Sequence, residues 1–489
     1  MPSESSYNHS TLIPPILQKG DYIYGTFLKP EVTNGYIKNS NPAYSKETLG
    51  NYSFSFSSIP QAIAYANAIH MHWKNRSIQT RMEPILRFQQ DIAQNHTYLT
   101  KMISIDCGYP LSEASMELND CIRFLQFLLE SAPRLLADIE QKKHTQKLIP
   151  FGCVALLTPH VHSFFHSVVF SASALLAGNV VIHKPSRYTP AIGQMIAEIW
   201  DRCNLKRGVY NMVQGPGTHI SQHLLKSPDI HALVCAGEHQ TTHYLNKKLP
   251  FHIPKLLFGG GKGSAIVLDS ADIVYTANCI VQGAIRAGGQ SPYGISHVFV
   301  EKGIAASLVE QIILAMSSLI ITPSGQNPPS MMGPLISEHA HQQYMQQQDQ
   351  IESYGHKKWP YEVSLAEEGF FVAPCLFEIN INKENLILDE EIHGPIIVLY
   401  EMADCNSSIK YAAKRSFRRS ISLFIDPNDD LLENILPQMP AGTTHINQLP
   451  SLPITSTAVH GKCANGAREG LGILRSLVEH MTIPKPEIF

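Results

Sequence analysis

Charged side chains are scarce in this sequence of 489 residues, at 16% of the chain, whereas soluble proteins average about 25%. The low share indicates that more of the surface than usual is covered, as in an oligomer. The formal net charge is −3 and the isoelectric point lies near 6.8. No excess of positive charge therefore favours binding to nucleic acid or to a membrane surface, and we expect neither partner.

The sequence also lacks paired cysteines and long apolar runs. Its nine cysteines contain no Cys-x-x-Cys pair, which argues against a disulfide framework or a structural zinc site and fits a reducing compartment. No apolar stretch reaches the roughly 18 residues of a membrane span. The first residues, Met1-Pro2-Ser3-Glu4-Ser5, lack the basic and then apolar order of a secretion signal. We predict a soluble, cytoplasmic protein.

Short apolar runs alternate with helical patterns from Gly152 onward. Strands are expected at 153–157, 180–182, 209–213, 232–235, 265–268 and 297–300. Helices are expected through 168–177 and at 189–200, 220–225, 275–286 and 304–319. This alternation predicts α/β structure with parallel sheets, because parallel neighbours need a crossover. Such sheets bind ligands beyond the carboxyl ends of their strands.

The flanking parts of the chain are less regular. The first 30 residues are polar and rich in proline, which indicates an arm or edge segment. Residues 59–140 have mostly helical apolar spacing. The glutamine run Gln346-Gln347-Gln348 is expected to lie on a solvated helix.

Short motifs follow one another in a characteristic order. They are Asn41-Pro42-Ala43, Pro150-Phe151-Gly152, Leu176-Ala177-Gly178-Asn179, Lys184-Pro185-Ser186, Gly208-Val209-Tyr210-Asn211, Gly289-Gln290, Glu390-Glu391-Ile392, Gly394-Pro395 and Arg468-Glu469-Gly470. Each is weak evidence alone, but the ordered set resembles the aldehyde dehydrogenase superfamily over nearly the whole chain. Three stretches look most similar to succinylglutamate semialdehyde dehydrogenase: Asn211-Met212-Val213-Gln214-Gly215, Gly333-Pro334-Leu335-Ile336-Ser337-Glu338 and Ser456-Thr457-Ala458.

The resemblance implies an α/β fold of three parts. Residues 1–128 and 150–257 would form a Rossmann-like nucleotide-binding domain. Residues 258–464 would form a second α/β domain of the catalytic type. Residues 129–149 and 465–489 would form a bridging oligomerisation hairpin, so we expect a homodimer or homotetramer.

The nucleophile motif of the superfamily reads Gly-Gln-x-Cys-x-x-x-Ser-Arg before an apolar strand, because aldehyde oxidation needs a thiolate. Here Gly289-Gln290 and Ser296-His297 align without a gap, so the cysteine position holds Pro292. Proline has no nucleophile and lacks the backbone N–H that the family aims at the oxyanion. Ser291 is adjacent, and an ordinary loop serine is its plainer interpretation.

Two further catalytic positions differ as well. The general-base motif Leu-Glu-Leu-Gly-Gly-Lys aligns with residues 257–262, so the position of the glutamate that activates water holds Phe258. The oxyanion asparagine of Pro-Trp-Asn-Phe-Pro aligns with Val161. With the nucleophile, the base and the oxyanion donor all replaced, we predict no dehydrogenase activity. The chain would instead bind a small ligand or a protein partner, or act as a non-catalytic subunit.

The cofactor positions are partly kept. The family implies NAD or NADP, and five positions bear on its binding: Lys184, Arg187, Gly237, Glu238 and Glu391. Lys184 and Glu391 match residues that contact the two riboses, and Arg187 could favour a 2′-phosphate. Glu238 follows Gly237 at a helix N-terminus where the pyrophosphate would sit, and it could satisfy that terminus itself and repel the phosphates. We therefore predict weak or absent cofactor binding.

Alternatives remain open at this point. The chain could be an active semialdehyde dehydrogenase with a displaced nucleophile, for which Cys235 and Cys463 are the candidates. Ser291 could support an esterase-like activity if a histidine, His162 or His460, reached its hydroxyl. His160 and His162 could share a metal ion, although 23 histidines in one chain also cluster by chance.

Overall fold

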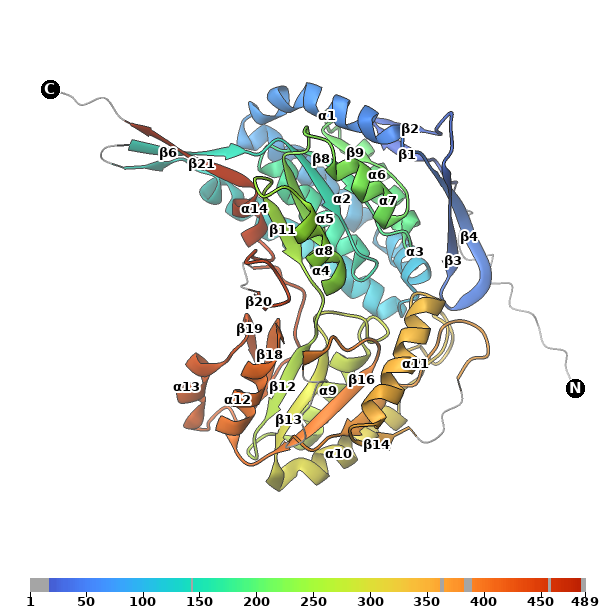
Figure 1. Cartoon of the computed structure of the whole chain (residues 1–489), viewed down its shortest axis with the longest axis vertical. Helices are drawn as coiled ribbons and strands as arrows, with labels where there is room; N and C mark the ends of the chain where they lie inside the picture. Colours follow the sequence, from blue (N-terminus) through green and yellow to red (C-terminus); the bar gives the residue numbers. More distant parts are fainter. Residues whose placement is uncertain (1–16, 142–143, 361–364, 382–388, 456–458, 485–489) are drawn as a thin grey trace, which may run out of the picture.

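The computed structural model describes residues 17–141, 144–360, 365–381, 389–455 and 459–484. Figure 1 shows two lobes, each built around a seven-stranded sheet, and a long β-ribbon that extends from the upper lobe. The upper sheet uses strands between residues 21 and 258, and the lower sheet uses strands between residues 263 and 446. The fold therefore contains two separate α/β units joined along the chain.

The upper sheet has the strand order β11-β10-β7-β8-β9-β1-β2, in which the first five strands are parallel and the last two are antiparallel edge strands. Its strands are β11 (Lys255–Phe258), β10 (Ala232–Ala236), β7 (Cys153–Leu157), β8 (Val180–Lys184), β9 (Tyr210–Met212), β1 (Asp21–Ile23) and β2 (Thr26–Leu28). Every residue of β7, β8 and β10 is buried, as expected for parallel strands with helices on both faces.

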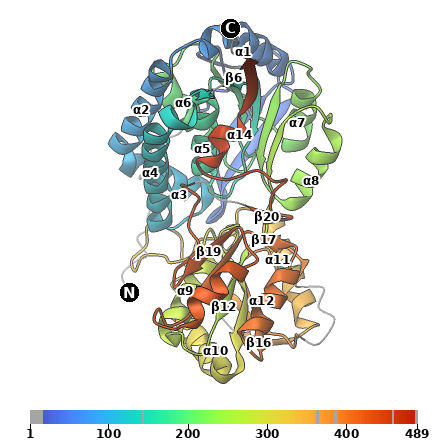
Figure 2. The same cartoon turned by 90° about the vertical axis from the view of Figure 1, so that its left-hand side faces the viewer.

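Helices surround the upper sheet, with α2, α4, α5 and α6 on one side of it and α7 and α8 on the other in Figure 2. They are α1 (Ser58–Lys74), α2 (Ile78–Gln94), α3 (His96–Cys107), α4 (Leu111–Leu135), α5 (Ser163–Leu176), α6 (Pro190–Arg202), α7 (Gly217–Leu225) and α8 (His239–Lys248). All 14 residues of α5 are buried, because α5 packs between the sheet and the outer helices. A helix covered on all sides lacks a polar face.

The lower sheet has the order β14-β15-β16-β13-β12-β18-β19 and is parallel except for β14. Its strands are β14 (His356–Trp359), β15 (Cys375–Glu378), β16 (Ile396–Met402), β13 (Ile295–Glu301), β12 (Gly263–Val267), β18 (Ser420–Phe424) and β19 (Thr443–Ile446). Alternate residues of β12 face opposite sides. Ile266 packs with α11 (Glu338–Glu352) and α12 (Cys405–Lys414), whereas Ala265 and Val267 pack with α9 (Ile273–Ile285) and α10 (Lys302–Ser317).

Two β-ribbons and several short elements complete the fold. The extended ribbon in Figure 1 pairs β6 (His144–Pro150) with β21 (Val478–Pro484), and β5 (Ile139–Glu140) lies on the other edge of β6. The second ribbon pairs β3 (Gly35–Asn41) with β4 (Tyr44–Phe54). The short elements are α13 (Leu431–Ile435), the 3-10 helix Leu436–Gln438, α14 (Gly472–Ser476), and the paired β17 (Phe417–Arg418) and β20 (His460–Gly461).

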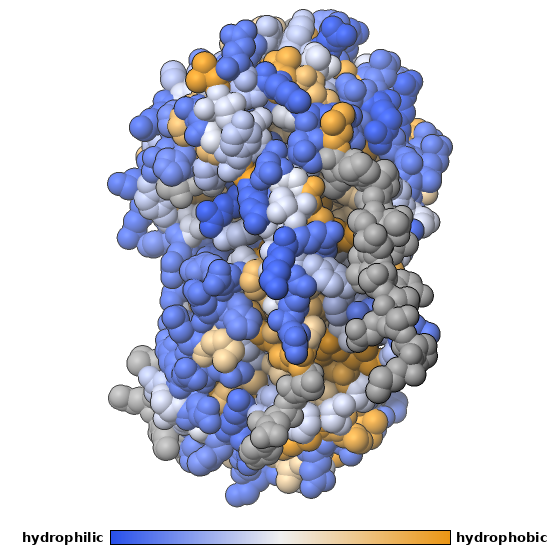
Figure 3. Space-filling view, turned by 90° about the vertical axis from the view of Figure 1, so that its right-hand side faces the viewer, coloured by the Kyte–Doolittle hydropathy of each residue, from blue (hydrophilic) through white to orange (hydrophobic). Residues whose placement is uncertain are grey.

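The predicted alternation of strands and helices after Gly152 is confirmed, with element ends that differ by a few residues. The N-terminal edge segment is confirmed for β1 and β2, whereas residues 1–16 and the Ser456-Thr457-Ala458 stretch lie outside the described residues. No helix in the described part of the chain is long and apolar enough to cross a membrane. Figure 3 shows mostly hydrophilic residues over the upper lobe and a gathering of apolar residues on the lower lobe.

The prediction that the glutamine run is solvated is wrong for two of its three members. Gln347 and Gln348 lie on α11, but their exposed fractions are only 8% and 9%. Gln347 donates to the carbonyl oxygen of Glu391 at 2.9 Å and accepts from the backbone N–H of His393 at 2.7 Å. Gln348 donates to the hydroxyl of Tyr344. These amides are buried because each has polar partners there.

Candidate active site

A cavity of about 1070 Å³ lies where the two lobes meet. The upper lobe lines it with residues at or just after the carboxyl ends of parallel strands: Thr158 after β7, Lys184 of β8, Gly237 after β10 and Phe258 of β11. The lower lobe lines it with residues that precede strands: Pro292 and Tyr293 before β13, Glu391 and His393 before β16, and Arg419 before β18. Its position beyond the carboxyl ends of a parallel sheet makes it the candidate site.

The loop between α9 and β13 brings Pro292 and Tyr293 into the cavity wall. The loop passes through Gly289, whose φ is 74°. A Cβ on Gly289 would lie 2.1 Å from the backbone nitrogen of Pro395, so only glycine allows this close approach. The turn leaves Ser291 buried behind the wall, at 1% exposure.

Apolar side chains close the part of the cavity near Pro292. Phe258 is 3% exposed and stacks on Phe170 of α5, with the ring centroids 5.7 Å apart. Val161, which lies just before α5, is also buried and lines the same cavity. Neither Phe258 nor Val161 can accept or donate a proton. The titratable group beside them in the cavity lining is His166, which packs against Phe170.

A buried ion pair supports the same wall. Arg419 donates to the carboxylate of Glu469 and to the carbonyl oxygen of Gly259. Tyr293 joins this pair, because its hydroxyl donates to Glu469 at 3.1 Å and its ring centroid lies 5.2 Å from the Arg419 guanidinium. Burial acts to lower the pKa of Arg419, but the Glu469 carboxylate more than offsets it and raises the pKa above its ordinary value.

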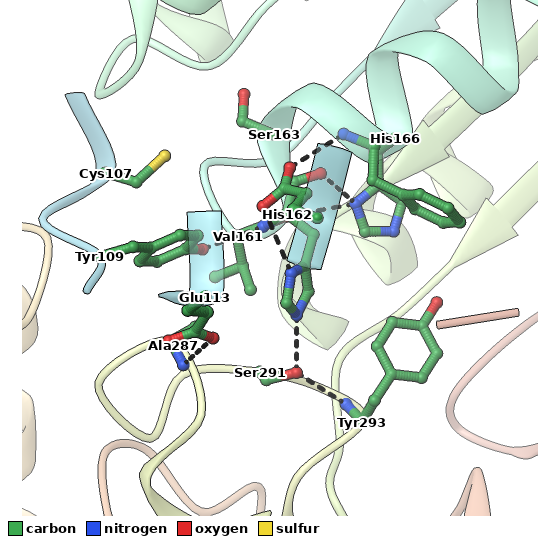
Figure 4. Close-up of polar contacts among 12 residues, drawn as sticks. Cys107, Tyr109, Glu113, Val161, His162, Ser163, His166, Ala287, Ser291 and Tyr293 are labelled. Atoms are coloured by element: carbon green, nitrogen blue, oxygen red, sulfur yellow. Dashed lines mark hydrogen bonds and ion pairs between the residues drawn. The ribbon is translucent and has the colours of Figure 1, made fainter. Parts of the chain in front are cut away.

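Behind the wall, Ser291, His162 and Glu117 lie in a buried row. Figure 4 shows His162 Nε2 pointing to Ser291 Oγ, at 2.8 Å. On the other side of the ring, His162 Nδ1 lies 3.6 Å from Oε2 of Glu117. His162 immediately precedes α5 with a φ of 47°, and its backbone N–H donates to the hydroxyl of Tyr109 at 3.1 Å. The structure therefore brings His162 within reach of Ser291, whereas the side chain of His460 lies outside the described residues.

Burial sets the protonation states in this row. Desolvation lowers the pKa of His162 to about 3, so its imidazole is neutral at neutral pH. Desolvation raises the pKa of Glu117 to about 7. The contact between Glu117 and His162 is therefore a polar contact to a neutral ring rather than an ion pair. The neutral imidazole can share a hydrogen bond with the Ser291 hydroxyl, but its low pKa makes it a weak base.

A carboxylate accepts hydrogen bonds at the N-terminus of α8, but it belongs to Glu391 rather than to Glu238. The prediction that Glu238 satisfies this terminus is wrong, because its exposed side chain makes no capping bond. Instead, Oε1 of Glu391 accepts from the N–H of Gly261 at 2.7 Å, and Oε2 accepts from the N–H of His239 at 3.4 Å. A Cβ on Gly260 would lie 1.5 Å from Glu391 Oε1, so the glycine run makes room for this carboxylate.

At the opposite end of the cavity, Lys184 is a buried cation. It is 6% exposed and lines the cavity, and its ammonium makes no hydrogen bond within the described part of the chain. Burial lowers the pKa of its ammonium group to about 8. Arg187 also lines the cavity, but its guanidinium donates to Tyr188 Oη at 2.7 Å and lies 4.8 Å from the centre of that ring. Gly237, next to Glu238, lies on the same wall.

The two cysteines considered as displaced nucleophiles are both buried, Cys235 at 2% exposure and Cys463 at 0%. Burial raises the pKa of the Cys235 thiol to about 12 and also raises the pKa of Cys463. Neither group forms a thiolate near neutral pH.

His160 packs edge-on against Tyr188 while His162 faces Ser291. Within the described ranges, no group of three His, Cys, Asp or Glu side chains is arranged to hold a metal ion.

Comparison with known proteins identifies the family. The model of the aldehyde dehydrogenase family matches residues 29–481. The chain belongs to the aldehyde dehydrogenase family. Curated relatives within it include the α-ketoglutaric semialdehyde dehydrogenase of Bacillus subtilis, which is 25% identical over 87% of this chain and 89% of that protein. The N-succinylglutamate 5-semialdehyde dehydrogenase of Vibrio cholerae is also 25% identical, over 88% of this chain and 87% of its own.

Solved aldehyde dehydrogenases share the whole fold. A Mycobacterium tuberculosis aldehyde dehydrogenase complexed with NAD+ matches with a TM-score of 0.89 and 21% identity, over 96% of this chain and 99% of that one. Aldehyde dehydrogenase C of Pseudomonas syringae, solved as a mutant with NAD+ and octanal, matches with a TM-score of 0.90 and 21% identity, over 95% and 96% of the two chains. The predicted α/β fold of the aldehyde dehydrogenase type is confirmed.

The aldehyde dehydrogenase fold brings together most of the residues that the motifs singled out. Pro292, Phe258, Val161, Glu391 and Lys184 all line one cavity. Ser291 lies just outside its lining. The sequence motifs did not single out Glu117, which faces His162, because it lies on α4 more than thirty residues before the Pro150-Phe151-Gly152 motif. Its one signal is a carboxylate on the buried face of an amphipathic helix, where an unpaired charge is rare.

We expect the Glu117 carboxyl to make folding stability depend on pH. A carboxyl whose pKa rises from 4.5 to about 7 on folding binds a proton more tightly in the folded state. The free energy of unfolding then falls as pH rises from 4.5 to 7 and levels off above that range. Glu117→Gln keeps the acceptor for the Phe165 N–H but cannot ionise. Relative to wild type, it should gain about 2–3 kcal/mol between pH 4.5 and 8.

Urea unfolding at a series of pH values measures this difference. Glu130→Gln is the matched control, because Glu130 lies on the same helix but is exposed, and it should leave the pH dependence unchanged. Identical pH dependence in wild type and Glu117→Gln would contradict the assignment.

Proposed function

We propose that this member of the aldehyde dehydrogenase family does not oxidise aldehydes and that its cavity serves to bind a small anionic ligand. The observation that carries the proposal is Pro292 in the wall of the cavity, at the position where the family motif has its cysteine. Proline offers no atom that can attack a carbonyl carbon. It also has no N–H to stabilise an oxyanion, and losing one such donor typically costs roughly 10²–10³ in rate.

The surroundings of Pro292 support the same conclusion. Deacylation needs a carboxylate that activates water, and Phe258 and Val161 supply none. Glu469 is near the same wall, but it is held by Arg419 and accepts the hydroxyl hydrogen of Tyr293.

The displaced-nucleophile alternative has little support. Cys235 and Cys463 are the candidates, and both thiols are buried with raised pKa values. A thiol must ionise to attack an aldehyde. Cys463 also does not line the cavity, whereas Cys235 lines it beside Gly237 on the upper-lobe side. Neither cysteine meets the chemical requirement that Pro292 leaves open.

The residues present do not fit a tightly held NAD or NADP. A pyrophosphate would need free N–H groups at the start of α8, but Glu391 accepts from the first of them, that of His239. The exposed carboxylate of Glu238 adds a second negative charge at the same helix end. We infer that dinucleotide binding is weak.

Lys184 favours a ligand with a smaller anionic group. Its ammonium is buried in the cavity without a hydrogen-bond partner among the described residues. A buried cation without a partner costs free energy, which a bound anion would offset. Arg187 lies close enough to act on the pKa of Lys184, so two cations mark this end of the cavity. A phosphate or carboxylate group fits them best.

Restoring the three family residues tests the loss of catalysis. The triple variant Val161→Asn, Phe258→Glu and Pro292→Cys, built on Glu238→Ser to relieve the cofactor site, should gain aldehyde-dependent reduction of NAD+ or NADP+. The semialdehydes of the two curated relatives are the substrates to use. The matched control replaces Pro292 with serine instead of cysteine and should stay inactive. Wild-type turnover as fast as that of the restored variant would contradict the proposal.

Glu238→Ser alone tests the electrostatic part of the cofactor argument. Serine removes one negative charge from the start of α8 and can cap the helix. For an exposed charge of this kind we expect NAD+ to bind about fivefold more tightly, as measured by isothermal titration calorimetry. Gln240→Ala is the control, because Gln240 lies two residues after Glu238 and is also exposed. Unchanged or weaker binding in Glu238→Ser would show that repulsion at this helix end is not the cause.

We also propose that two subunits pair through the extended ribbon. Among the residues that the structure describes, strand β21 pairs only with β6, so its other edge has no strand partner there. Its apolar Met481 is 49% exposed. An open edge with exposed apolar residues is a template for pairing with another chain.

Met481→Lys should weaken the dimer, as measured by sedimentation velocity over a concentration series. A wild-type chain that sediments as a monomer throughout would contradict this arrangement.

A further inference from the structure

A second cavity, of about 610 Å³, lies on the upper lobe. Its wall includes the end of α1, the first part of α2, the turn between β1 and β2, and the loop between α6 and β9. Figure 1 shows α1 and β2 at the end of the upper lobe that faces away from the lower lobe. The two cavities share no lining residue, so the proposed ligand-binding function leaves this one unassigned.

Positive charge is concentrated in the lining of the second cavity. Four arginine and lysine side chains line it against only two carboxylates. The cations are Arg76, Arg87, Lys206 and Arg207, and the carboxylates are those of Glu83 and Asp201. One oxygen of Asp201 already accepts the Tyr22 hydroxyl hydrogen, at 2.9 Å, and the chain as a whole has a net charge of −3. A concave site with a local excess of one charge attracts ligands of the opposite charge, so this cavity favours an anion.

Three of the four cations have no partner of their own. The side chains of Arg87, Lys206 and Arg207 make no hydrogen bond or ion pair within the described part of the chain. By contrast, the nearby Arg202 donates to both carboxylate oxygens of Asp91, at 2.7 and 2.8 Å. The guanidinium donors at the cavity are therefore available to a ligand.

The backbone directs Lys206 and Arg207 toward the cavity. Just after α6, Asn204 takes the left-handed conformation, with a φ of 56°, and the chain turns toward β9. Gly25, in the turn between β1 and β2, has a φ of 75°, and a Cβ there would lie 2.7 Å from Arg207 Cγ. Only glycine lets the arginine stem lie against this turn. The position of Arg207 therefore depends on packing against a fixed turn rather than on a charged partner.

Helix ends do not account for the whole cluster. Cations near a helix C-terminus are stabilised by the helix dipole, an effect that is confined to the last turn. Both α1 and α6 end beside this cavity, so the dipole can explain the cations that follow them. Arg87, however, lies in the interior of α2. Glu83 precedes it by four residues, the spacing of a helical ion pair, yet the described structure holds no such pair.

We propose that this second cavity binds a compound that carries two or more linked phosphate groups. A guanidinium donates in pairs to phosphate oxygens, and the cations come from three separate segments around the cavity. A single small anion contacts only part of that set, whereas a chain of phosphates can span it. The volume of about 610 Å³ is ordinary for a small-molecule site. A free polyphosphate and a nucleotide share this chemistry.

Isothermal titration calorimetry of the full-length protein at low ionic strength tests the site, with tripolyphosphate, orthophosphate and ATP as probes. We expect tripolyphosphate to bind at least about tenfold more tightly than orthophosphate, because more of its oxygens contact the cations. ATP that binds no more tightly than tripolyphosphate would identify the phosphate chain as the recognised group, and tighter ATP binding would identify a nucleotide. No binding of either compound would overturn the proposal.

A double variant, Arg87→Gln with Arg207→Gln, removes two of the unpaired guanidinium groups. It should weaken tripolyphosphate binding at least about tenfold, and because both side chains are exposed, it should unfold at the wild-type temperature. The matched control, Arg134→Gln with Arg475→Gln, removes the same charge from exposed positions outside both cavities and should bind like wild type. Equal weakening in the two double variants would overturn the site, since general charge would then explain the binding.

Lys184→Gln separates this site from the cavity between the lobes. It removes the buried cation of that other cavity and should leave tripolyphosphate binding at the second cavity unchanged. The reverse result, in which Lys184→Gln loses the binding and the arginine double variant keeps it, would overturn this proposal while supporting the proposed function.

Discussion

The ion pair between Arg419 and Glu469 is the interaction on which the arrangement of the cavity depends. It joins the start of β18 to the C-terminal segment, and a second arginine N–H reaches the carbonyl oxygen of Gly259 at the end of the upper sheet. Both charged side chains are almost fully buried. Removing one partner of such a pair typically costs about 3–5 kcal/mol, because the other charge is left buried and unpaired. The pair also fixes the hydroxyl of Tyr293, and so it fixes one wall of the cavity.

The cavity has the backbone turns of the family fold, and we propose that the chemistry of its lining differs from that of the family motifs. The glycines that permit the close packing of the loops are present: Gly289 lies against Pro395, and Gly260 against Glu391. Three of the side chains that line the cavity, at the positions where the family motifs have catalytic residues, are a proline, a phenylalanine and a valine. These three cannot form a thiolate, activate water or donate to an oxyanion. Backbone turns and reactive groups are thus separable features of this fold. The turns depend on packing, whereas the chemistry depends on a few side chains.

The fold and most cavity-lining residues could be predicted from the sequence because they depend on local signals. Strand β7 reads as five consecutive apolar residues, and the motif around Gly289 aligns without a gap. The contact between His162 and Ser291 was stated only as a condition, because the two residues are 129 positions apart and only the packed structure sets their distance. Glu117 has only one sequence signal, its place on the apolar face of an amphipathic helix, and this signal does not show which distant residue it faces.

Two predictions failed for the same physical reason. Glu238 was expected to serve the start of α8, and the run that contains Gln347 was expected to be solvated. In the structure the Glu391 carboxylate accepts from the first N–H of α8. The Gln347 side chain hydrogen-bonds to the backbone of Glu391 and of His393. Both errors concern polar groups whose partners come from distant parts of the chain. Local propensity predicts where a polar residue is favoured by default, but tertiary hydrogen bonds decide where it ends up.

The central claim is that a chain with Pro292 in the cavity wall cannot oxidise an aldehyde. The most direct test mixes the purified wild-type protein with each relative's semialdehyde and saturating NAD+ or NADP+, and follows the absorbance of the reduced nicotinamide. With Pro292 at the cysteine position, we expect no rate above that of the protein-free solution. A steady, enzyme-dependent rate that disappears in Cys235→Ser or Cys463→Ser would contradict it and would identify the nucleophile that replaces the missing cysteine.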